Sequence, residues 1–189
     1  MTRISLAEAT AALTGPGQPF EMEEAVIRGI PTRVWKKAPA TLRTVLELSR
    51  AHGEADFLVY EDERLSFEHH YRAAATLAHR LGQRFGVVKG DRVAIAMRNL
   101  PEWVIAFWAA AVAGAVVVPL NAWWTTDELA YGLADSGAVV VVTDRERAER
   151  IRPRLPELPA LRAVVVADER HRASPTAPAP ETASPPAPG

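Results

Sequence analysis

The chain has 189 residues, 48% of them apolar and 24% charged, which is the composition of an ordinary globular protein of about one domain. Its formal net charge of −1 does not indicate nucleic acid or an anionic membrane surface as a partner. The lack of cysteine excludes disulfides, cysteine zinc sites and thiol nucleophiles, and it fits a reducing, cytoplasmic location.

Residues 1–40 are predicted to form an arm that lies on a larger body. The N-terminus has no continuous apolar segment of the kind found in signal peptides. Ile4–Leu13 is predicted to be a short helix, which the glycines and prolines of residues 15–19 end. Residues 26–34 are expected to be extended.

Two helices and a hairpin are predicted between residues 41 and 86. Thr41 is placed to cap a helix that ends near Gly53, and residues 57–66 have the pattern of a β-hairpin. Ser66 is placed to cap a second helix, which Gly86 ends. The apolar stripe of that helix consists of Phe67, Tyr71, Ala74, Ala78, Leu81 and Phe85.

From Trp103 to Leu120 the chain has no polar side chain, which is the pattern of either a membrane span or two pieces of a core. Eighteen helical residues would reach about 27 Å, which barely spans the apolar core of a bilayer. Gly114 and Pro119 interrupt the run, and Val116–Val118 favours a strand. The run is therefore predicted to contain most of a helix and then a strand after Gly114. The helix is predicted to begin before the run, with Asn99 as its cap.

The rest of the pattern predicts an α/β fold with a mostly parallel sheet flanked by helices. Strands are expected at residues 92–97, 116–118, 139–142 and 164–166, and Thr125 with Glu128 predicts a capping box for the helix between the second and third. The predicted domains are the arm at 1–40, the α/β domain at 41–168 and a disordered Pro/Ala-rich tail at 169–189.

A search for known site motifs finds no GxGxxG, no GxxxxGK[ST] and no GxSxG. The segment VKGDR at residues 88–92 contains one glycine and is interpreted as a turn before a strand. The YGLAD segment at residues 131–135 lies in a predicted helix and is interpreted as a chance match to a Tyr-Gly box.

The histidines, the acidic pair and the paired tryptophans are each explained by helix structure or packing rather than by catalysis. His69, His70 and His79 lack the i, i+4 spacing of a zinc helix and are expected to be solvated. Asp127 and Glu128 suit the first turn of a helix better than a pair of catalytic carboxylates. The two tryptophans at 123–124 are expected to pack at a domain seam, with a ligand stack as the alternative.

Two stretches resemble the first part of adenylate-forming ligases, the family of acyl-CoA synthetases. Leu65–Glu68, LSFE, resembles an early box that opens a helix, and residues 114–121, GAVVVPLN, match the pattern Gly-Ala-x-x-x-Pro-Leu-Asn. The Gly-Asp-Arg-Val of residues 90–93 and the Asn-x-x-Glu of 99–102 fit in order and spacing. The segment NAWWTTDEL at residues 121–129 departs from the charged and proline-rich sequence that is commoner in the family. It resembles a fatty-acyl or long-chain subgroup.

The resemblance implies a two-step reaction that uses ATP, Mg²⁺ and CoA on a fatty acid or another carboxylate. The carboxylate displaces pyrophosphate from ATP, and the CoA thiol then displaces AMP from the acyl-adenylate. The phosphate loop, the Tyr-Gly-x-Thr-Glu box, the ribose-binding Asp and the late lysine that carry this chemistry do not occur in the sequence. We therefore assign no catalytic, cofactor-binding or metal-binding residue, and we expect the chain alone to bind none of these cofactors. The rival interpretation is that a smaller, partial active site survives at the strand ends near Asn99, Asn121 and Asp144.

The preferred interpretation is a fragment of an ATP-dependent acyl-CoA synthetase that is inactive alone. Its end is expected to result from a truncation or a frame shift. The alternative is a free-standing, non-catalytic α/β binding module. The sequence predicts no nucleic-acid partner and no transmembrane segment. It does predict an exposed apolar surface through which the chain could associate with itself.

Overall fold

The structure, a computed structural model, describes residues 4–167, and the predicted tail lies outside the described residues. Contacts divide the chain into two units that meet at Ala73 and Ala74. Helix α3 (Phe67–Phe85) begins in the first unit and continues into the second, and its bounds match the predicted helix.

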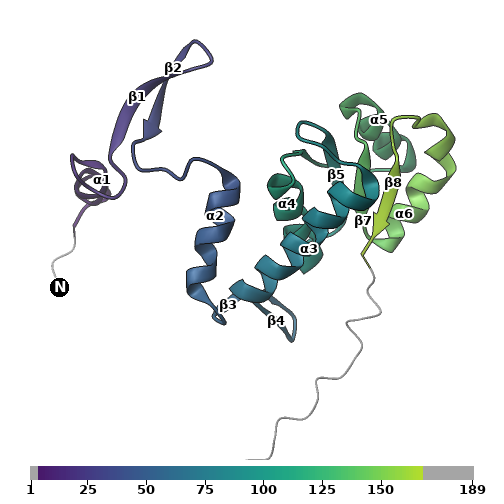
Figure 1. The fold of residues 1–189 in the computed structure, drawn as a ribbon, viewed down its shortest axis with the longest axis horizontal. Helices are drawn as coiled ribbons and strands as arrows, with labels where there is room; N and C mark the ends of the chain where they lie inside the picture. The colour runs from purple at the N-terminus through teal and green to yellow at the C-terminus, as the bar shows by residue number, and fades with distance from the viewer. Residues whose placement is uncertain (1–3, 168–189) are drawn as a thin grey trace, which may run out of the picture. The chain divides into compact units, whose positions relative to one another are not determined.

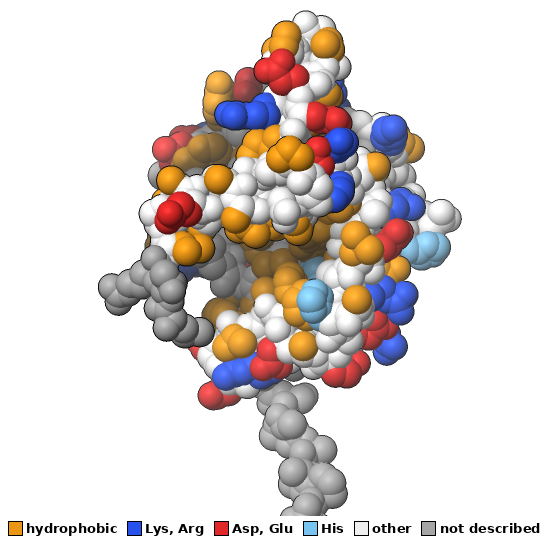
Figure 2. Space-filling view, turned by 90° about the vertical axis from the view of Figure 1, so that its left-hand side faces the viewer, with side chains coloured by type: hydrophobic (Ala, Val, Ile, Leu, Met, Phe, Trp, Pro, Cys, Tyr) orange, Lys and Arg blue, Asp and Glu red, His pale blue; other side chains and the backbone are white. Residues whose placement is uncertain are grey.

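The first unit begins with helix α1 (Leu6–Thr14) and a hairpin of β1 (Met22–Ile27) and β2 (Ile30–Trp35). The prediction of one extended segment over 26–34 is therefore wrong at its centre, because Arg28 and Gly29 form a tight turn with φ of 51° and 83°. No residue from 4 to 45 is buried. Exposed hydrophobic side chains are drawn in orange in Figure 2.

The remainder of the first unit confirms the predicted helix and hairpin. Helix α2 (Leu42–Ser49) follows its cap Thr41, whose hydroxyl accepts the Thr44 N–H at 3.1 Å. A short 3-10 turn η1 (Arg50–His52) leads to the antiparallel strands β3 (Asp56–Tyr60) and β4 (Glu63–Ser66). The Ser66 hydroxyl accepts the His69 N–H at 3.2 Å and so caps α3.

The second unit contains a parallel sheet of four strands, as the sequence predicts. Its strands lie in the order β6-β5-β7-β8, and each neighbouring pair is parallel. The strands are β5 (Arg92–Ala96), β6 (Val116–Pro119), β7 (Val140–Thr143) and β8 (Ala163–Val166). The central strands β5 and β7 are buried on both faces, whereas the valine-rich edge strands β6 and β8 are only partly buried.

The helices of this unit lie on both sides of the sheet, with α4 on one side and α5 and α6 on the other (Figure 1). Their bounds, with the 3-10 segment after α6, are α4 (Pro101–Val112), α5 (Thr126–Ser136), α6 (Arg145–Ile151) and η2 (Arg152–Glu157). The core on the α5 and α6 side includes Ala94 and Ala96 of β5, Val141 of β7, and Leu129 and Leu133 of α5.

The uncharged run is a helix followed by a strand, as predicted. Helix α4 ends at Val112, Gly114 adopts a left-handed φ of 78°, and β6 begins at Val116. The predicted cap is wrong by one residue, because Leu100 rather than Asn99 is the N-cap and makes no side-chain bond. Within residues 4–167, no helix has the length and apolar character needed to cross a bilayer.

Candidate functional site

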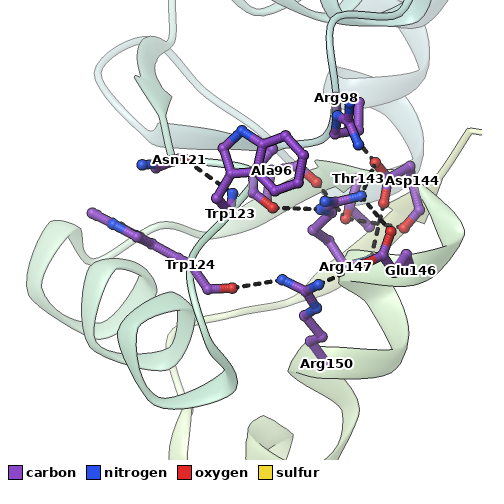
Figure 3. Close-up of polar contacts among 11 residues, drawn as sticks. Ala96, Arg98, Asn121, Trp123, Trp124, Thr143, Asp144, Glu146, Arg147 and Arg150 are labelled. Carbon is purple, nitrogen blue, oxygen red and sulfur yellow. Dashed lines mark hydrogen bonds and ion pairs between the residues drawn. The ribbon is translucent and has the colours of Figure 1, made fainter.

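Polar residues follow β5, β6 and β7 at one edge of the sheet, because parallel strands end on the same side. Arg98 follows β5, Asn121 follows β6 and Asp144 follows β7. This edge is where open α/β sheets bind ligands, so it is the natural place to look for a site. Figure 3 shows the contacts made there.

Asp144 is buried, with 2% of its surface exposed, and it holds two elements together. Its Oδ1 accepts the Arg147 N–H at 2.9 Å, which caps α6. Its Oδ2 accepts the Arg98 backbone N–H at 3.0 Å and Arg147 Nη1 at 3.1 Å. A buried carboxylate is stable only when its charge is paired and hydrogen-bonded, and this one has three donors.

The Arg147 side chain, also 2% exposed, ties Asp144 to the loop after β6. Its Nε donates to the Ala122 carbonyl at 2.7 Å, and its Nη1 also contacts Glu146 at 2.9 Å. Its Nη2 is buried, and no acceptor lies within bonding distance among residues 4–167. A buried donor without an acceptor costs about 1–3 kcal/mol.

The loop after β6 places Trp123 at the surface and Trp124 partly buried against the core. Asn121 Oδ1 accepts the Trp123 N–H at 2.9 Å, and Arg150 Nη1 donates to the Trp124 carbonyl at 2.9 Å. Trp124 packs on the core beside α5, so close to Gly132 that a Cβ there would lie 2.7 Å from the ring. That close approach explains a glycine inside α5.

The two tryptophans therefore have different environments, and the packing of Trp123 at a domain seam remains a prediction. Its side chain is 68% exposed, and the Arg98 guanidinium lies 4.2 Å from the ring centroid. A cation at this distance from an indole face is attracted to it. The stack holds the Arg98 side chain at the edge of the sheet with its donors still open to solvent.

Arg98, Asp144 and Arg147 border an open depression of about 640 Å³. Its lining contains four arginines and three acidic residues, together with Leu100: Arg98, Arg145, Arg147, Arg150, Asp144, Glu146 and Glu149. Within residues 4–167, Arg98 and Arg145 form no ion pair, whereas all three acidic residues do. The lining therefore has one more basic than acidic residue, and the donors of Arg98 and Arg145 suit an oxyanion such as a phosphate or carboxylate.

The predicted ordinary interpretations hold for most of the other candidates. Residues 88–92 form a turn with Gly90 at φ 91°, and residues 131–135 lie inside α5. Glu128 closes a capping box with Thr125, and Asp127 forms an ion pair with Arg154. Among residues 4–167, no group of three His, Cys, Asp or Glu side chains is arranged to hold a metal ion.

The interpretation of His70 as a solvated helix histidine is wrong. His69 is exposed, but His70 is 1% exposed and its ring lies 4.5 Å from that of Phe57. The helix period explains the difference, because His70 is on the face that also buries Ala74 and Ala78. The predicted apolar stripe contained no histidine.

The arginines of the depression are the residues that sequence reasoning missed. Arg147 and Arg150 are spaced i, i+3 directly after a valine-rich strand, and this spacing was the only available signal. Of the rival site residues, Asp144 belongs to this cluster and Asn121 forms the adjacent turn. Asn99 is exposed and does not line the depression.

Comparison with known proteins identifies the family. The model of the family described as AMP-binding enzyme matches residues 46–188, more than half of the chain. The chain belongs to the AMP-binding enzyme family. The resemblance to adenylate-forming ligases noted from the sequence is thereby confirmed.

Curated members of the AMP-binding family that the chain resembles are CoA ligases. A medium/long-chain-fatty-acid–CoA/3-oxocholest-4-en-26-oate–CoA ligase of Mycobacterium marinum is 34% identical over 112 residues, which are 59% of this chain and 20% of that protein. A long-chain-fatty-acid–CoA ligase of Yersinia pestis is 40% identical over 80 residues, 42% of this chain and 14% of that protein. The chain thus spans about a fifth or less of these relatives.

Solved structures of AMP-binding enzymes share the fold. The N-terminal domain of FACL13 from Mycobacterium tuberculosis superposes with a TM-score of 0.63 at 27% identity and covers 71% of this chain and 36% of that one. An anthranilate CoA ligase in complex with anthranoyl-AMP has a TM-score of 0.65 at 25% identity, with 69% and 26% covered. The predicted fold, an N-terminal subdomain of an adenylate-forming ligase, is confirmed.

Proposed function

We propose that this chain supplies the N-terminal part of an ATP-dependent acyl-CoA ligase that acts on a fatty acid or another carboxylate. Its family membership and the fatty-acid–CoA ligases among its relatives support this proposal. We also propose that residues 4–167 alone do not activate a carboxylate and that the remaining groups come from other parts of the full enzyme.

The residues present do not fit the ATP and Mg²⁺ that this reaction requires. Magnesium needs several oxygen ligands in octahedral geometry, and the one buried carboxylate at the sheet edge, Asp144, is already bonded to three N–H groups. No glycine-rich turn presents successive amides to a triphosphate. Adenylation therefore has no route through the described residues, and no step is assigned to them.

The depression at the sheet edge does fit a single oxyanion group of a reactant. The observation that carries this is that the exposed guanidinium groups of Arg98 and Arg145, which line the depression, form no ion pair within residues 4–167. Guanidinium groups bind phosphate and carboxylate oxygens through paired N–H donors. In the full ligase, this edge would contact a phosphate of a nucleotide or coenzyme and position it.

Inorganic phosphate is the direct probe of this depression. We expect saturable shifts of the Arg98 and Arg147 Nε–H signals and of the Trp123 indole signal in NMR titrations of the full chain with phosphate. Arg98→Ala should weaken the binding, and Arg80→Ala, an exposed arginine on α3, should leave it unchanged. Equal shifts at Arg80, or none at Arg98 and Trp123, would contradict the proposed role.

Calorimetry with ATP tests the other half of the proposal. Because one oxyanion site supplies only a few contacts, ATP should bind more weakly than about 1 mM, with or without Mg²⁺. Micromolar ATP affinity would show that residues of this chain complete a nucleotide site.

A further inference from the structure

Glu146, in the first turn of α6, binds two of the arginines that line the depression (Figure 3). Its Oε2 accepts a hydrogen bond from Arg147 Nη1 at 2.9 Å, and its Oε1 accepts one from Arg150 Nη2. The two guanidinium groups therefore converge on a single carboxylate. Guanidinium donors that hold both oxygens of a carboxylate can hold two oxygens of a phosphate in the same way.

Both arginines are also held in place by other partners. Arg147 Nε donates to the Ala122 carbonyl at 2.7 Å, and its Nη1 donates to the buried Asp144 at 3.1 Å. Arg150 Nη1 donates to the Trp124 carbonyl at 2.9 Å. These contacts do not involve the shared carboxylate, so the two guanidinium groups keep their positions when that carboxylate moves away.

The shared carboxylate is the part of this contact that can leave. The Glu146 side chain is 58% exposed, and within residues 4–167 its carboxylate pairs with Arg147 and Arg150 alone. Ion pairs of an exposed carboxylate contribute little to stability, because water solvates the released charge. Release of Glu146 into solvent would uncover one donor on each arginine.

The pair of Glu146 and Arg150 would be ordinary by itself, because residues spaced i, i+4 are neighbours on a helix surface. The contact with Arg147 sets it apart. Among residues 4–167, Glu146 is the one acidic residue of the lining that joins two of its arginines through their side chains. Glu149, by contrast, binds Arg152, which does not line the depression.

We propose that the Glu146 carboxylate closes an oxyanion subsite between Arg147 and Arg150, and that an incoming phosphate group displaces it. This inference rests on the proposed oxyanion role of the depression, which it extends from Arg98 and Arg145 to two further arginines. The apparent affinity of a site is reduced by the fraction of molecules in which the site is closed. Glu146 therefore sets the phosphate concentration at which the subsite fills, without binding the phosphate itself.

The charges at the subsite favour this exchange. A phosphate monoester carries about −1.5 to −2 charge at pH 7, which is more than the single charge of a carboxylate. The two guanidinium groups therefore attract the phosphate more strongly than the carboxylate that it replaces. The displaced Glu146 side chain is already more than half exposed, so it enters water without crossing the core.

Phosphate titrations of the full chain at constant ionic strength, followed through the Trp123 indole and arginine Nε–H NMR signals, test the displacement. Glu146→Gln should bind inorganic phosphate about fivefold more tightly than the parent, the factor for a subsite that is closed about 80% of the time. Glu157→Gln removes the same charge from a side chain that is 59% exposed and lies outside the lining. This control should bind like the parent.

Glu146→Asp separates the contact from the charge. The variant keeps the negative charge, but its shorter side chain cannot reach Arg147 and Arg150 at once. It should bind phosphate about two- to threefold more tightly than the parent, because the closed state is less populated. An effect of charge alone predicts parental binding. Urea unfolding should show both Glu146 variants to be folded and close to the parent in stability, because the ion pairs that they lose have an exposed carboxylate.

The double variant Glu146→Gln/Arg150→Ala locates the subsite. Removal of Arg150 should abolish the gain in affinity that Glu146→Gln gives, because one of the two donors is lost. A gain that persists in the double variant would contradict a subsite between Arg147 and Arg150.

The results distinguish this inference from the proposed oxyanion role. If neither the parent nor Glu146→Gln binds phosphate, both are wrong. If the parent binds phosphate through Arg98 and Glu146→Gln binds it equally or more weakly, the oxyanion role stands and the displacement of Glu146 is wrong. Tighter binding by Glu146→Gln together with parental binding by Glu146→Asp would also overturn the displacement, since it would assign the effect to charge alone.

Discussion

Removal of the Asp144 carboxylate is expected to destabilise the second unit strongly. Asp144→Ala leaves the Arg147 guanidinium buried with less compensation and removes the acceptor of the Arg98 N–H and of the α6 cap. Breaking a buried ion pair from one side costs about 3–5 kcal/mol. Because Glu146 and the Ala122 carbonyl still contact Arg147, we expect about 3 kcal/mol, at the lower end of that range.

Urea unfolding followed by circular dichroism measures this cost. The matched control is Asp127→Ala, which removes an ion pair to Arg154 whose side chains are 75% and 36% exposed. Exposed pairs contribute about 0–1 kcal/mol, so the control should unfold close to the parent. A loss of less than about 1 kcal/mol in Asp144→Ala, the upper end for an exposed pair, would contradict this expectation.

The double variant Asp144→Ala/Arg147→Met separates the ion pair from its surroundings. Replacing both partners of a buried pair with apolar groups is often nearly neutral. The double variant should therefore be more stable than Asp144→Ala alone. If it is less stable, the bond from Arg147 Nε to the Ala122 carbonyl rather than the charge pair supplies most of the stabilisation.

Three further changes test the packing and the capping of α5. Gly132→Ala should cost about 1–3 kcal/mol in urea unfolding, because its Cβ would lie 2.7 Å from Trp124 Cζ3. Leu133→Ala, at a side chain 2% exposed, should cost about 2–5 kcal/mol in the same assay. Hydrogen bonds from Thr125 hold the pKa of Glu128 below its usual value of 4.5, so its stabilising effect is present above that pH and is lost as the pH falls through the lowered pKa. The difference in unfolding free energy between the parent and Glu128→Gln should therefore shrink in acid.

Each of these predictions has a clear contrary result. A stabilised Gly132→Ala would mean that helix propensity, worth about 1 kcal/mol, outweighs the contact with the indole. A loss of unfolding free energy below this range in Leu133→Ala would mean that the surrounding core relaxes to fill the cavity. A Glu128→Gln effect that is constant from neutral pH to strong acid would mean that the charge of the carboxylate is not what stabilises the cap.

The fold of the second unit could be predicted because its signals are local. The valine runs of β6 and β7 are separated by the capping box of Thr125 and Glu128, and Gly114 and Gly137 mark helix ends. The N-terminal hairpin was missed because its turn residue Arg28, at φ 51°, is not one that turn patterns favour.

The candidate site could not be predicted, because its geometry depends on contacts between segments far apart in the sequence. Arg98 meets Trp123 and Asp144 only after the strands have paired, and no pattern in the sequence links them. His70 was misjudged for a similar reason, because Phe57 reaches it from another element. The cytoplasmic location and the self-association remain predictions.

ATP–pyrophosphate exchange by the purified chain, with fatty acids of several lengths, tests most directly whether the chain alone performs the chemistry of its family. We expect no carboxylate-dependent exchange, because no residues of 4–167 are arranged to hold a triphosphate and its metal ion. Exchange that persists through purification and is lost in Asn121→Ala, which removes the acceptor of the Trp123 N–H, would contradict this expectation. Such a result would place a working adenylation site at the edge of this sheet.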